Sequence, residues 1–300
     1  MQKIKLAANL EISRLVHGHW RLREWNLSDQ ELLALTLQAI ETGITTFDHA
    51  DIYGNYSCEK KFGDALALKS ELRRDIRIVT KCGIKILSDK FPERKIQYYD
   101  YSAGNIIASV ENSLANFRTD YIDLLLLHRP SPLLNPHEVA EAFQQLKKQG
   151  KVLYFGVSNF NPQQYAMLNA YLDAKLVTNQ VEISPFCLEH FQNGNMDYFL
   201  EQKIKPMAWS PLAVRELFYA GSDKGQRIQD ALTEVAQELN CDSIDKVIYA
   251  WLLKHPASII PIIGSGKIER IRLAAEALNL DMSLQQWFKI YTASTGIPMA

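Results

Sequence analysis

The chain has 300 residues, of which 47% are hydrophobic and 22% charged, and its net charge is -1 at pH 7. This is the composition of an ordinary globular protein that can bury a large core. The near balance of charge excludes an overall attraction to nucleic acid or to anionic membranes, although it does not exclude local basic patches.

The four cysteines lie far apart in the sequence, so they lack the close spacing of a zinc site. They are expected to be reduced thiols, which indicates a reducing compartment. The N-terminal segment 1–13 lacks the apolar core of a signal peptide, and no run of about 18 apolar residues occurs. We therefore expect a cytoplasmic protein with no membrane-spanning segment.

Short apolar segments alternate along the chain with amphipathic ones. They are rich in Val, Ile, Leu, Phe and Tyr, which is typical of strands covered on both faces. A hairpin over residues 3–12 is predicted to precede them. The predicted strands cover residues 13–18, 44–48, 76–81, 122–128, 152–158, 176–182, 204–210 and 258–263.

Helix patterns with start and stop signals lie between most of these strands. The first begins at the capping box from Ser28 to Glu31 and ends at Gly43. Asn161 and Pro162 provide a cap and a first-turn proline for another. Further helices are predicted over residues 105–117, 139–150, 226–240, 243–254 and 268–278, and after a cap at Ser283.

Right-handed connections between such strands build either an open doubly wound sheet or a closed (β/α)8 barrel. Eight units, with no glycine fingerprint after the first strand, favour a single TIM barrel over residues 1–300. The N-terminal hairpin, the extra C-terminal helices and a polar segment from Ile84 to Gly104 are additions to that pattern.

Reactive side chains occur where the predicted strands end, which is the working face of a barrel. Asp48 ends the second strand, with Tyr53 five positions further on. Lys81 ends the third strand and His128 follows the fourth. Singly, each has a commoner explanation, such as a solvated lysine or a structural histidine. Together, at three successive strand ends, they indicate one site.

The surrounding segments resemble the aldo-keto reductase family, as found in bacterial NADP-dependent oxidoreductases. The matches occur in family order over almost the whole chain and are FDHADIYG, IVTK, LLLLHRP, GKVLYFGVSNF, TNQVEISPF, AWSPL and PIIGSGKIER. The resemblance implies a barrel enzyme that reduces an aldehyde or ketone to an alcohol with NADPH. It also implies a small carbonyl substrate and a monomer or weak oligomer.

In such an enzyme Asp48, Tyr53, Lys81 and His128 would form the catalytic tetrad. Carbonyl reduction needs a hydride, which no side chain supplies, and a proton for the developing alkoxide. Tyr53 would donate the proton, and the ammonium of Lys81 would pull the tyrosine pKa down from about 10. Asp48 would hold Lys81 in place, and His128 would orient and polarise the substrate oxygen.

The same resemblance predicts which residues contact the nicotinamide. Ser158, Asn159 and Gln180 would hydrogen-bond its carboxamide, and Trp209 would stack on its ring. Trp20 is included among these cofactor-binding residues and would also line the entrance of the substrate pocket. Selectivity for the substrate is expected in segments 84–104 and 211–225 and in the tail after residue 287, but its identity cannot be read from them.

The other end of the cofactor would lie near Ser210 and Leu212, which approach the pyrophosphate in the family. The residues placed to contact the 2′-phosphate are Ser265, Lys267, Arg270 and Arg272. Arginine suits this dianion because its planar fork bonds bidentately, which favours NADPH over NADH. Many family members have a Glu-Asn pair that reads adenine where this chain has Leu273 and Ala274, so the adenine contacts are expected to differ.

Three more histidines lie near this site in the sequence. His49 either contacts substrate or has a structural role, and the structural role is favoured. His17 and His19 suggest a metal pair, but they are predicted to face opposite ways along a strand. No metal is therefore expected.

Two other functions remain open from the sequence. One is an NADP(H)-binding regulatory or partner subunit with little turnover. The other is an unrelated barrel hydrolase or aldolase that uses Lys81 as a Schiff-base nucleophile. The complete tetrad favours the reductase.

Overall fold

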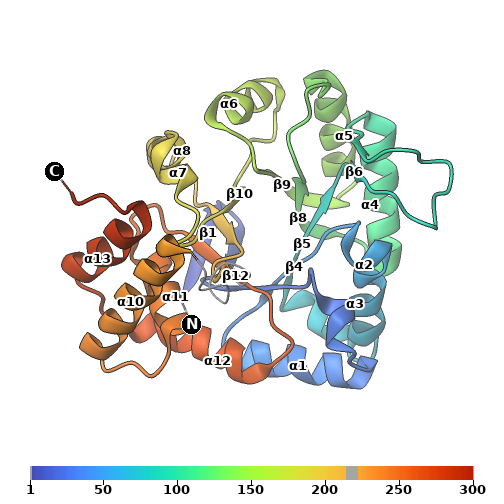
Figure 1. Ribbon diagram of the computed structural model, residues 1–300. Coiled ribbons are helices and arrows are strands. Elements are labelled where there is room, and N and C mark those ends of the chain that lie inside the picture. Colours follow the sequence, from blue (N-terminus) through green and yellow to red (C-terminus); the bar gives the residue numbers. More distant parts are fainter. Residues whose placement is uncertain (1, 214–221, 300) are drawn as a thin grey trace.

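The computed structural model describes residues 2–213 and 222–299, and at its centre eight parallel strands form a closed barrel surrounded by helices (Figure 1). The barrel strands are β3 Val16–Gly18, β4 Thr46–Asp48, β5 Arg77–Cys82, β8 Ile122–Leu127, β9 Val152–Ser158, β10 Asn179–Glu182, β11 Met207–Trp209 and β12 Ile260–Ile263. They neighbour one another in chain order, and β12 pairs with β3 to close the barrel. The predicted TIM barrel is confirmed, and each predicted strand overlaps one of these.

Most strands are followed by a helix that covers the outside of the barrel. These helices are α1 Asp29–Glu41, α3 Cys58–Ala67, α4 Ala103–Phe117, α5 Pro136–Lys148, α6 Pro162–Tyr171, α8 Asn195–Glu201, α11 Ile244–Lys254 and α12 Ile268–Glu276. Their apolar sides pack on the strands, as where the ring of Phe143 stacks on that of Phe155 at 3.9 Å between centroids. This packing is what the amphipathic pattern predicts.

Local signals set most helix starts. The capping boxes at Ser28, Asn161 and Ser283 are all present. Helix α4 begins earlier than predicted, because the side chain of Ser102 accepts the backbone N–H of Asn105 and so caps it. Helix α3 and the short helices α7 Glu189–Gln192 and α8 were not predicted from the sequence.

A hairpin closes the amino end of the barrel, as predicted. It consists of β1 Lys3–Ala7 and β2 Leu10–Ser13. Ile4, Leu10 and Ile12 are buried in the same cluster as the inward-facing Val79 and Leu124 of the barrel. Since apolar side chains fill this end, the opposite end is left for chemistry.

The remaining elements extend the barrel. They are the turn α2 Tyr53–Tyr56, the hairpin strands β6 Ile84–Lys85 and β7 Tyr98–Tyr99, the helices α10 Asp223–Glu238 and α13 Leu284–Thr295, and the 3-10 helices η1 Leu22–Trp25, η2 Ser70–Arg74 and η3 Ala277–Asn279. The segment between β6 and β7 reaches outward beyond α4 in Figure 1.

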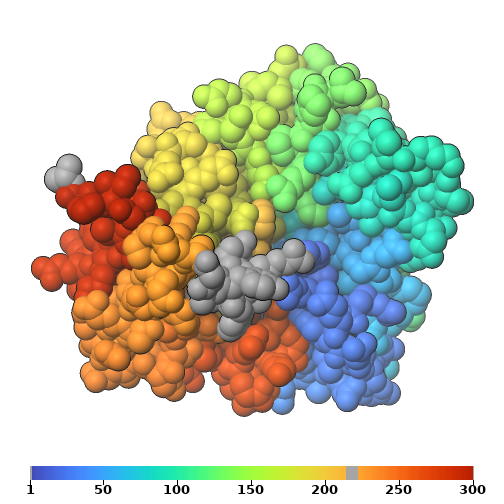
Figure 2. Space-filling view, in the orientation of Figure 1, coloured from blue at the N-terminus to red at the C-terminus, as the bar shows by residue number. Residues whose placement is uncertain are grey.

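The first and last units of the barrel lie side by side. Helix α1 contacts α12, and Figure 2 shows the blue N-terminal part adjoining the orange and red C-terminal part. Among the helices described, none is long and apolar enough to span a bilayer.

Candidate active site

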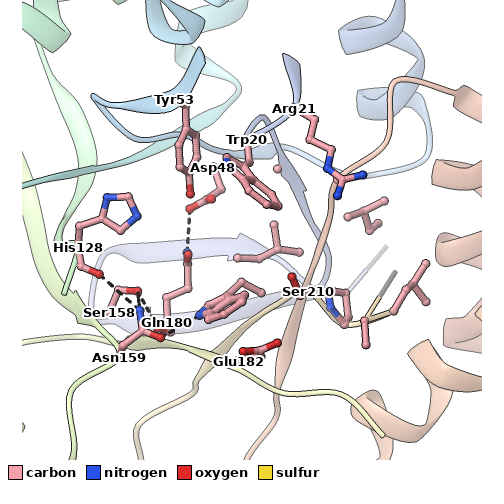
Figure 3. A pocket seen from close by; sticks show the side chains of 18 of the residues that line it. Trp20, Arg21, Asp48, Tyr53, His128, Ser158, Asn159, Gln180, Glu182 and Ser210 are labelled. Atoms are coloured by element: carbon pink, nitrogen blue, oxygen red, sulfur yellow. Dashed lines mark hydrogen bonds between the residues drawn. The ribbon is translucent and has the colours of Figure 1, made fainter. Parts of the chain in front are cut away.

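A cavity of about 760 Å³ opens at the carboxyl ends of the barrel strands (Figure 3). This volume lies in the usual range for small-molecule sites. The predicted residues that line it are Trp20, Asp48, Tyr53, His128, Ser158, Asn159, Gln180, Trp209, Ser210, Leu212, Ser265 and Arg270. Lys81 lies buried behind this wall, and Lys267 is exposed and does not belong to the lining.

Lys81 is the centre of the tetrad. Its Nζ donates to both carboxylate oxygens of Asp48, at 2.9 and 2.7 Å, and to the main-chain oxygen of His49 at 2.7 Å. It also donates to the phenol oxygen of Tyr53 at 3.1 Å. Burial alone would lower the pKa of Lys81, but the charge of Asp48 outweighs it, and the pKa is raised. Lys81 therefore stays charged in a site that water does not reach.

The effect of Lys81 on Tyr53 differs from the prediction. Burial raises the pKa of Tyr53 above its ordinary value, and the nearby ammonium of Lys81 opposes this without reversing it. The expected net lowering is thus wrong for this structure, because desolvation of the phenolate is the larger effect. Because the phenol oxygen accepts a hydrogen bond from Lys81, the phenolic hydrogen points away from Lys81. The tyrosine is held in its protonated form.

His128 completes the group. Its ring lies edge-on to that of Tyr53, with 5.8 Å between centroids, and Figure 3 shows Tyr53, His128 and Asp48 converging on one point. Burial, followed by the charges of Lys81 and Arg129, holds the pKa of His128 well below its usual range. The imidazole is therefore neutral and can donate a hydrogen bond from one nitrogen.

A left-handed turn positions Tyr53. Gly54, Asn55 and Tyr56 have φ angles of 58°, 54° and 60°. Such a conformation costs a non-glycine residue about 1 kcal/mol or more. Asn55 donates to Asp89 at 2.9 Å, and the hydroxyl of Tyr56 accepts from Arg94 at 2.6 Å. The segment between β6 and β7 therefore stabilises the turn that aims the tyrosine.

Two of the three segments expected to line the substrate end do so. Ile84, Gln97 and Tyr99 line the cavity. So do residues 211–213, whereas residues 214–221 of the predicted 211–225 segment lie outside the described part of the chain.

The predicted contribution of the C-terminal tail is wrong for the described residues. No residue from 287 to 299 lines the cavity. Helix α13 instead packs against the helices α10 and α11, outside the barrel. The indole N–H of Trp251 donates to the main-chain oxygen of Trp287 at 3.2 Å. The indole N–H of Trp287 in turn donates to the main-chain oxygen of Trp251 at 3.1 Å. The tail is held there by its apolar face.

The residues expected at the nicotinamide form one hydrogen-bond network. Trp209 donates from its indole to the amide oxygen of Asn159 at 3.0 Å, and Asn159 donates to the hydroxyl of Ser158 at 2.7 Å. That hydroxyl donates to the main-chain oxygen of Gln180 at 2.8 Å. The side-chain nitrogen of Gln180 donates to Asp48 at 2.8 Å, so this side chain is tied to the tetrad. The network fixes the orientation of the Trp209 indole at the wall of the cavity.

Two residues that the sequence analysis did not single out line the far end of the cavity. Asp245 and Tyr249 of α11 lie there with Arg270. Burial raises the pKa of Asp245, and the charge of Arg270 opposes this. They precede β12 in the chain and belong to no recognisable motif, so only their helix brings them to the cavity.

Three buried histidines form a stack behind the site. The ring centroids of His17 and His19 are 4.5 Å apart, and those of His19 and His49 are 4.4 Å apart and nearly parallel. The prediction that His17 and His19 face opposite ways is wrong, because residues two apart in a strand point to the same side. His49 is fully buried and does not line the cavity, so it does not reach a substrate there, and its structural role stays a prediction.

The stack carries no sign of a metal site. Phe47, Phe62 and Phe117 pack around it. In the part of the chain that the structure describes, no group of three or more His, Cys, Asp or Glu side chains could hold a metal ion.

We expect this stack to make the fold sensitive to acid. Burial lowers the pKa of His17 to about 4 and lowers those of His19 and His49 well below their usual range. The folded state then binds fewer protons than the unfolded state, so the free energy of unfolding falls as pH drops below about 6.5. The expected slope is up to about 1.4 kcal/mol per pH unit for each histidine that stays neutral.

Urea unfolding at about pH 7.5 and about pH 5 measures this dependence. His19→Phe is expected to reduce the slope, whereas His137→Phe, at an exposed position, serves as the control. An equal slope in wild type and His19→Phe would contradict the assignment.

These features define a class of protein: a TIM-barrel enzyme with an acid–base site at the carboxyl face of its strands. Comparison with known proteins gives the family. The description "Aldo/keto reductase family" matches residues 14–294. The chain belongs to this family and is an oxidoreductase; members use nicotinamide cofactors on small carbonyl substrates.

Several relatives match over the whole chain. The uncharacterized oxidoreductase YcsN of Bacillus subtilis is 55% identical, over 99% of both chains. The oxidoreductase YdhF of Escherichia coli is 48% identical, over 99% of this chain and 98% of its own. A 6-dehydroglucose reductase of Agrobacterium fabrum is 42% identical, over 100% of both. The solved structure of a thermostable aldo-keto reductase with the inhibitor epalrestat has a TM-score of 0.82 and 25% identity, covering 98% of this chain and all of that one.

Proposed function

We propose that the chain, as one barrel domain, reduces an aldehyde or ketone with NADPH and that Tyr53 donates the proton. One observation carries this proposal: a single buried ammonium, that of Lys81, bonds both Asp48 and the phenol oxygen of Tyr53 at the wall of the cavity. The arrangement supports a protonated tyrosine whose phenolate, once formed, has a fixed positive charge beside it. The relatives named above are oxidoreductases or reductases by name, and nothing favours a purely regulatory role.

The proposed reaction divides between the cofactor and the side chains. Bound NADPH supplies the hydride. The neutral imidazole of His128 donates a hydrogen bond to the carbonyl oxygen and orients it toward Tyr53. The phenol then gives its proton to that oxygen as negative charge develops, and Lys81 stabilises the phenolate that remains. Asp48 keeps the ammonium in place throughout.

The cavity fits a nicotinamide dinucleotide. The indole of Trp209 offers a flat face on which the nicotinamide would stack. The side-chain oxygen of Gln180 makes no hydrogen bond with another described residue, so it is available to accept one from the carboxamide. At the far end Ser265 and Arg270 offer a hydroxyl and a guanidinium to a phosphate. Lys267 is exposed beside them and would add charge of modest effect.

The preference for NADPH depends on Arg270, and we expect Arg270→Ala to weaken NADPH binding about tenfold or more while changing NADH binding little. The two cofactors differ only in the 2′-phosphate, so the group that meets this dianion decides between them. Fluorescence titrations of both cofactors against wild type and variant measure the effect. Equal losses for both would show that Arg270 acts on another part of the cofactor.

Turnover is tested by the absorbance of NADPH with a panel of aldehydes, ketones and sugar-derived carbonyl compounds. The last group is included because two relatives, 42% and 37% identical, are named 6-dehydroglucose reductases. Absence of NADPH oxidation with every member of the panel, by protein that binds NADPH, would contradict the proposed function.

A further inference from the structure

One cation in the cavity has no role in the reaction described so far. Arg129 follows His128 directly and lines the cavity. Its guanidinium carbon lies 5.4 Å from the centre of the Trp209 ring. Across residues 2–213 and 222–299, this guanidinium makes no hydrogen bond and no ion pair. A half-buried cation without a counter-charge is unusual, because desolvation makes it costly.

The main chain of Arg129 is held firmly. The hydroxyl of Tyr101 accepts the backbone N–H of Arg129 at 3.0 Å and donates to its carbonyl oxygen at 2.5 Å. Tyr101 is buried, and its ring packs directly against Gly83, where a β-carbon would come within 1.9 Å of it. The main chain of this arginine, from which the guanidinium extends, is therefore fixed before any ligand binds.

No carboxylate among the described residues neutralises Arg129. Three described carboxylates line the cavity. Asp48 is paired with Lys81, Asp245 lies near Arg270, and Glu182 already has an interaction partner of its own. The other lining cation near the mouth is Arg21, which lies over the exposed ring of Trp20 at 5.3 Å. In Figure 3 Arg21 lies on the far side of Trp20 from His128.

The topology argues against a role for Arg129 at the cofactor phosphates. Those phosphates are proposed to lie at Ser265 and Arg270, which follow β12. Arg129 follows β8, and β8 and β12 are four strands apart in a closed barrel of eight. They lie on opposite sides of the barrel, so Arg129 lies on the side of the cavity away from Ser265 and Arg270.

We propose that Arg129 binds an anionic group of the substrate, a carboxylate or a phosphate, so that the enzyme prefers oxo acids or phosphorylated aldehydes to their neutral counterparts. This inference rests on the proposed reductase function. A guanidinium binds either anion through two parallel hydrogen bonds, and this would pair the charge of Arg129 that the described residues leave unpaired.

Matched substrate pairs test the inference. One pair is 4-oxobutanoate and its methyl ester; the other is glyceraldehyde 3-phosphate and glyceraldehyde. The measured quantity is the ratio of kcat/KM for the anionic member to that for the neutral member, with saturating NADPH. Any effect of Arg129 on the reacting groups is common to both members of a pair, so it cancels in the ratio. The two pairs separate carboxylate from phosphate as the preferred anion.

Wild type is expected to favour the anionic member of at least one pair, and Arg129→Met to lower that ratio about 10- to 100-fold. Arg129→Lys keeps the charge but loses the fork, so an intermediate ratio is expected. Arg74→Met changes the net charge equally at an exposed position at the end of η2, before β5 and away from the cavity, and should leave the ratio unchanged. Raising the ionic strength should lower the wild-type ratio, which tests the inference even if Arg129→Met fails to fold.

Three results would overturn it. A wild-type ratio near one, insensitive to salt, would show that charge is not recognised. An equal loss for glyceraldehyde and its phosphate in Arg129→Met would leave the ratio unchanged and would show that the arginine acts on a group that both substrates share, not on the anion. In both cases the neutral substrates would still be reduced and the proposed function would stand. Failure to reduce any of the four substrates or the wider panel would remove the proposed function and this inference with it.

Discussion

Replacing Tyr53 by phenylalanine is expected to lower kcat about 10²- to 10⁴-fold while NADPH still binds. The phenyl ring keeps the packing against His128 but removes the hydroxyl proton that we propose is transferred to the substrate oxygen. The phenol is half-buried, and desolvation raises its pKa, so it holds this proton across the neutral range. Single-turnover reduction of a good aldehyde, combined with a fluorescence titration of NADPH, measures both effects.

Tyr171→Phe provides a matched control, because Tyr171 lies half exposed on α6, outside the cavity. It should retain wild-type kcat. If Tyr53→Phe kept more than about a tenth of the wild-type kcat, Tyr53 would not be the general acid, since such groups contribute about 10² or more.

Lys81→Met is expected to abolish reduction, because the phenolate left by proton transfer would have no positive charge beside it. The pKa of Tyr53 would rise further, since the ammonium is the main influence that opposes burial. The same change leaves the carboxylate of Asp48 buried without its partner. Such a loss typically costs about 3–5 kcal/mol of stability. Activity and the free energy of unfolding must therefore be measured together.

Asp48→Asn separates the two effects. It leaves the ammonium in place, still bonded to the main-chain oxygen of His49 and near the phenol, so the loss of kcat should be smaller than in Lys81→Met. The double variant Asp48→Asn with Lys81→Met has no unpaired charge, and it should recover stability without recovering activity. Equal kcat for Asp48→Asn and Lys81→Met in folded preparations would contradict this ordering.

Several features of the fold and site could be predicted from the sequence because they depend on local patterns. Buried strands repeat with helix signals between them, and this pattern predicts parallel strands wound into a barrel. The carboxyl ends of parallel strands share one edge, so Asp48 at the end of β4 and Lys81 near the end of β5 had to come close together. The ion pair follows from strand register alone.

Other features depend on segments that meet only in the folded chain. Asp245 of α11 lines the cavity. Asp89, in the segment between β6 and β7, accepts a hydrogen bond from Asn55 and so stabilises the turn after Tyr53. Tyr101 holds Arg129 from 28 residues away. No short-range pattern marks these contacts, because each partner could equally have been a solvated surface residue.

The state of the buried groups was decided by the tertiary structure alone. From the sequence, Lys81 was expected to lower the pKa of Tyr53, but the depth of burial determines the balance and raises it. His17, His19 and His49 stack in the core because Phe47 of β4, Phe62 of α3 and Phe117 of α4 pack around them. A pKa depends on every neighbour that excludes water, and those neighbours come from the whole barrel. The sequence determined which chemical groups meet at the strand ends, and the tertiary structure decided which of them are charged.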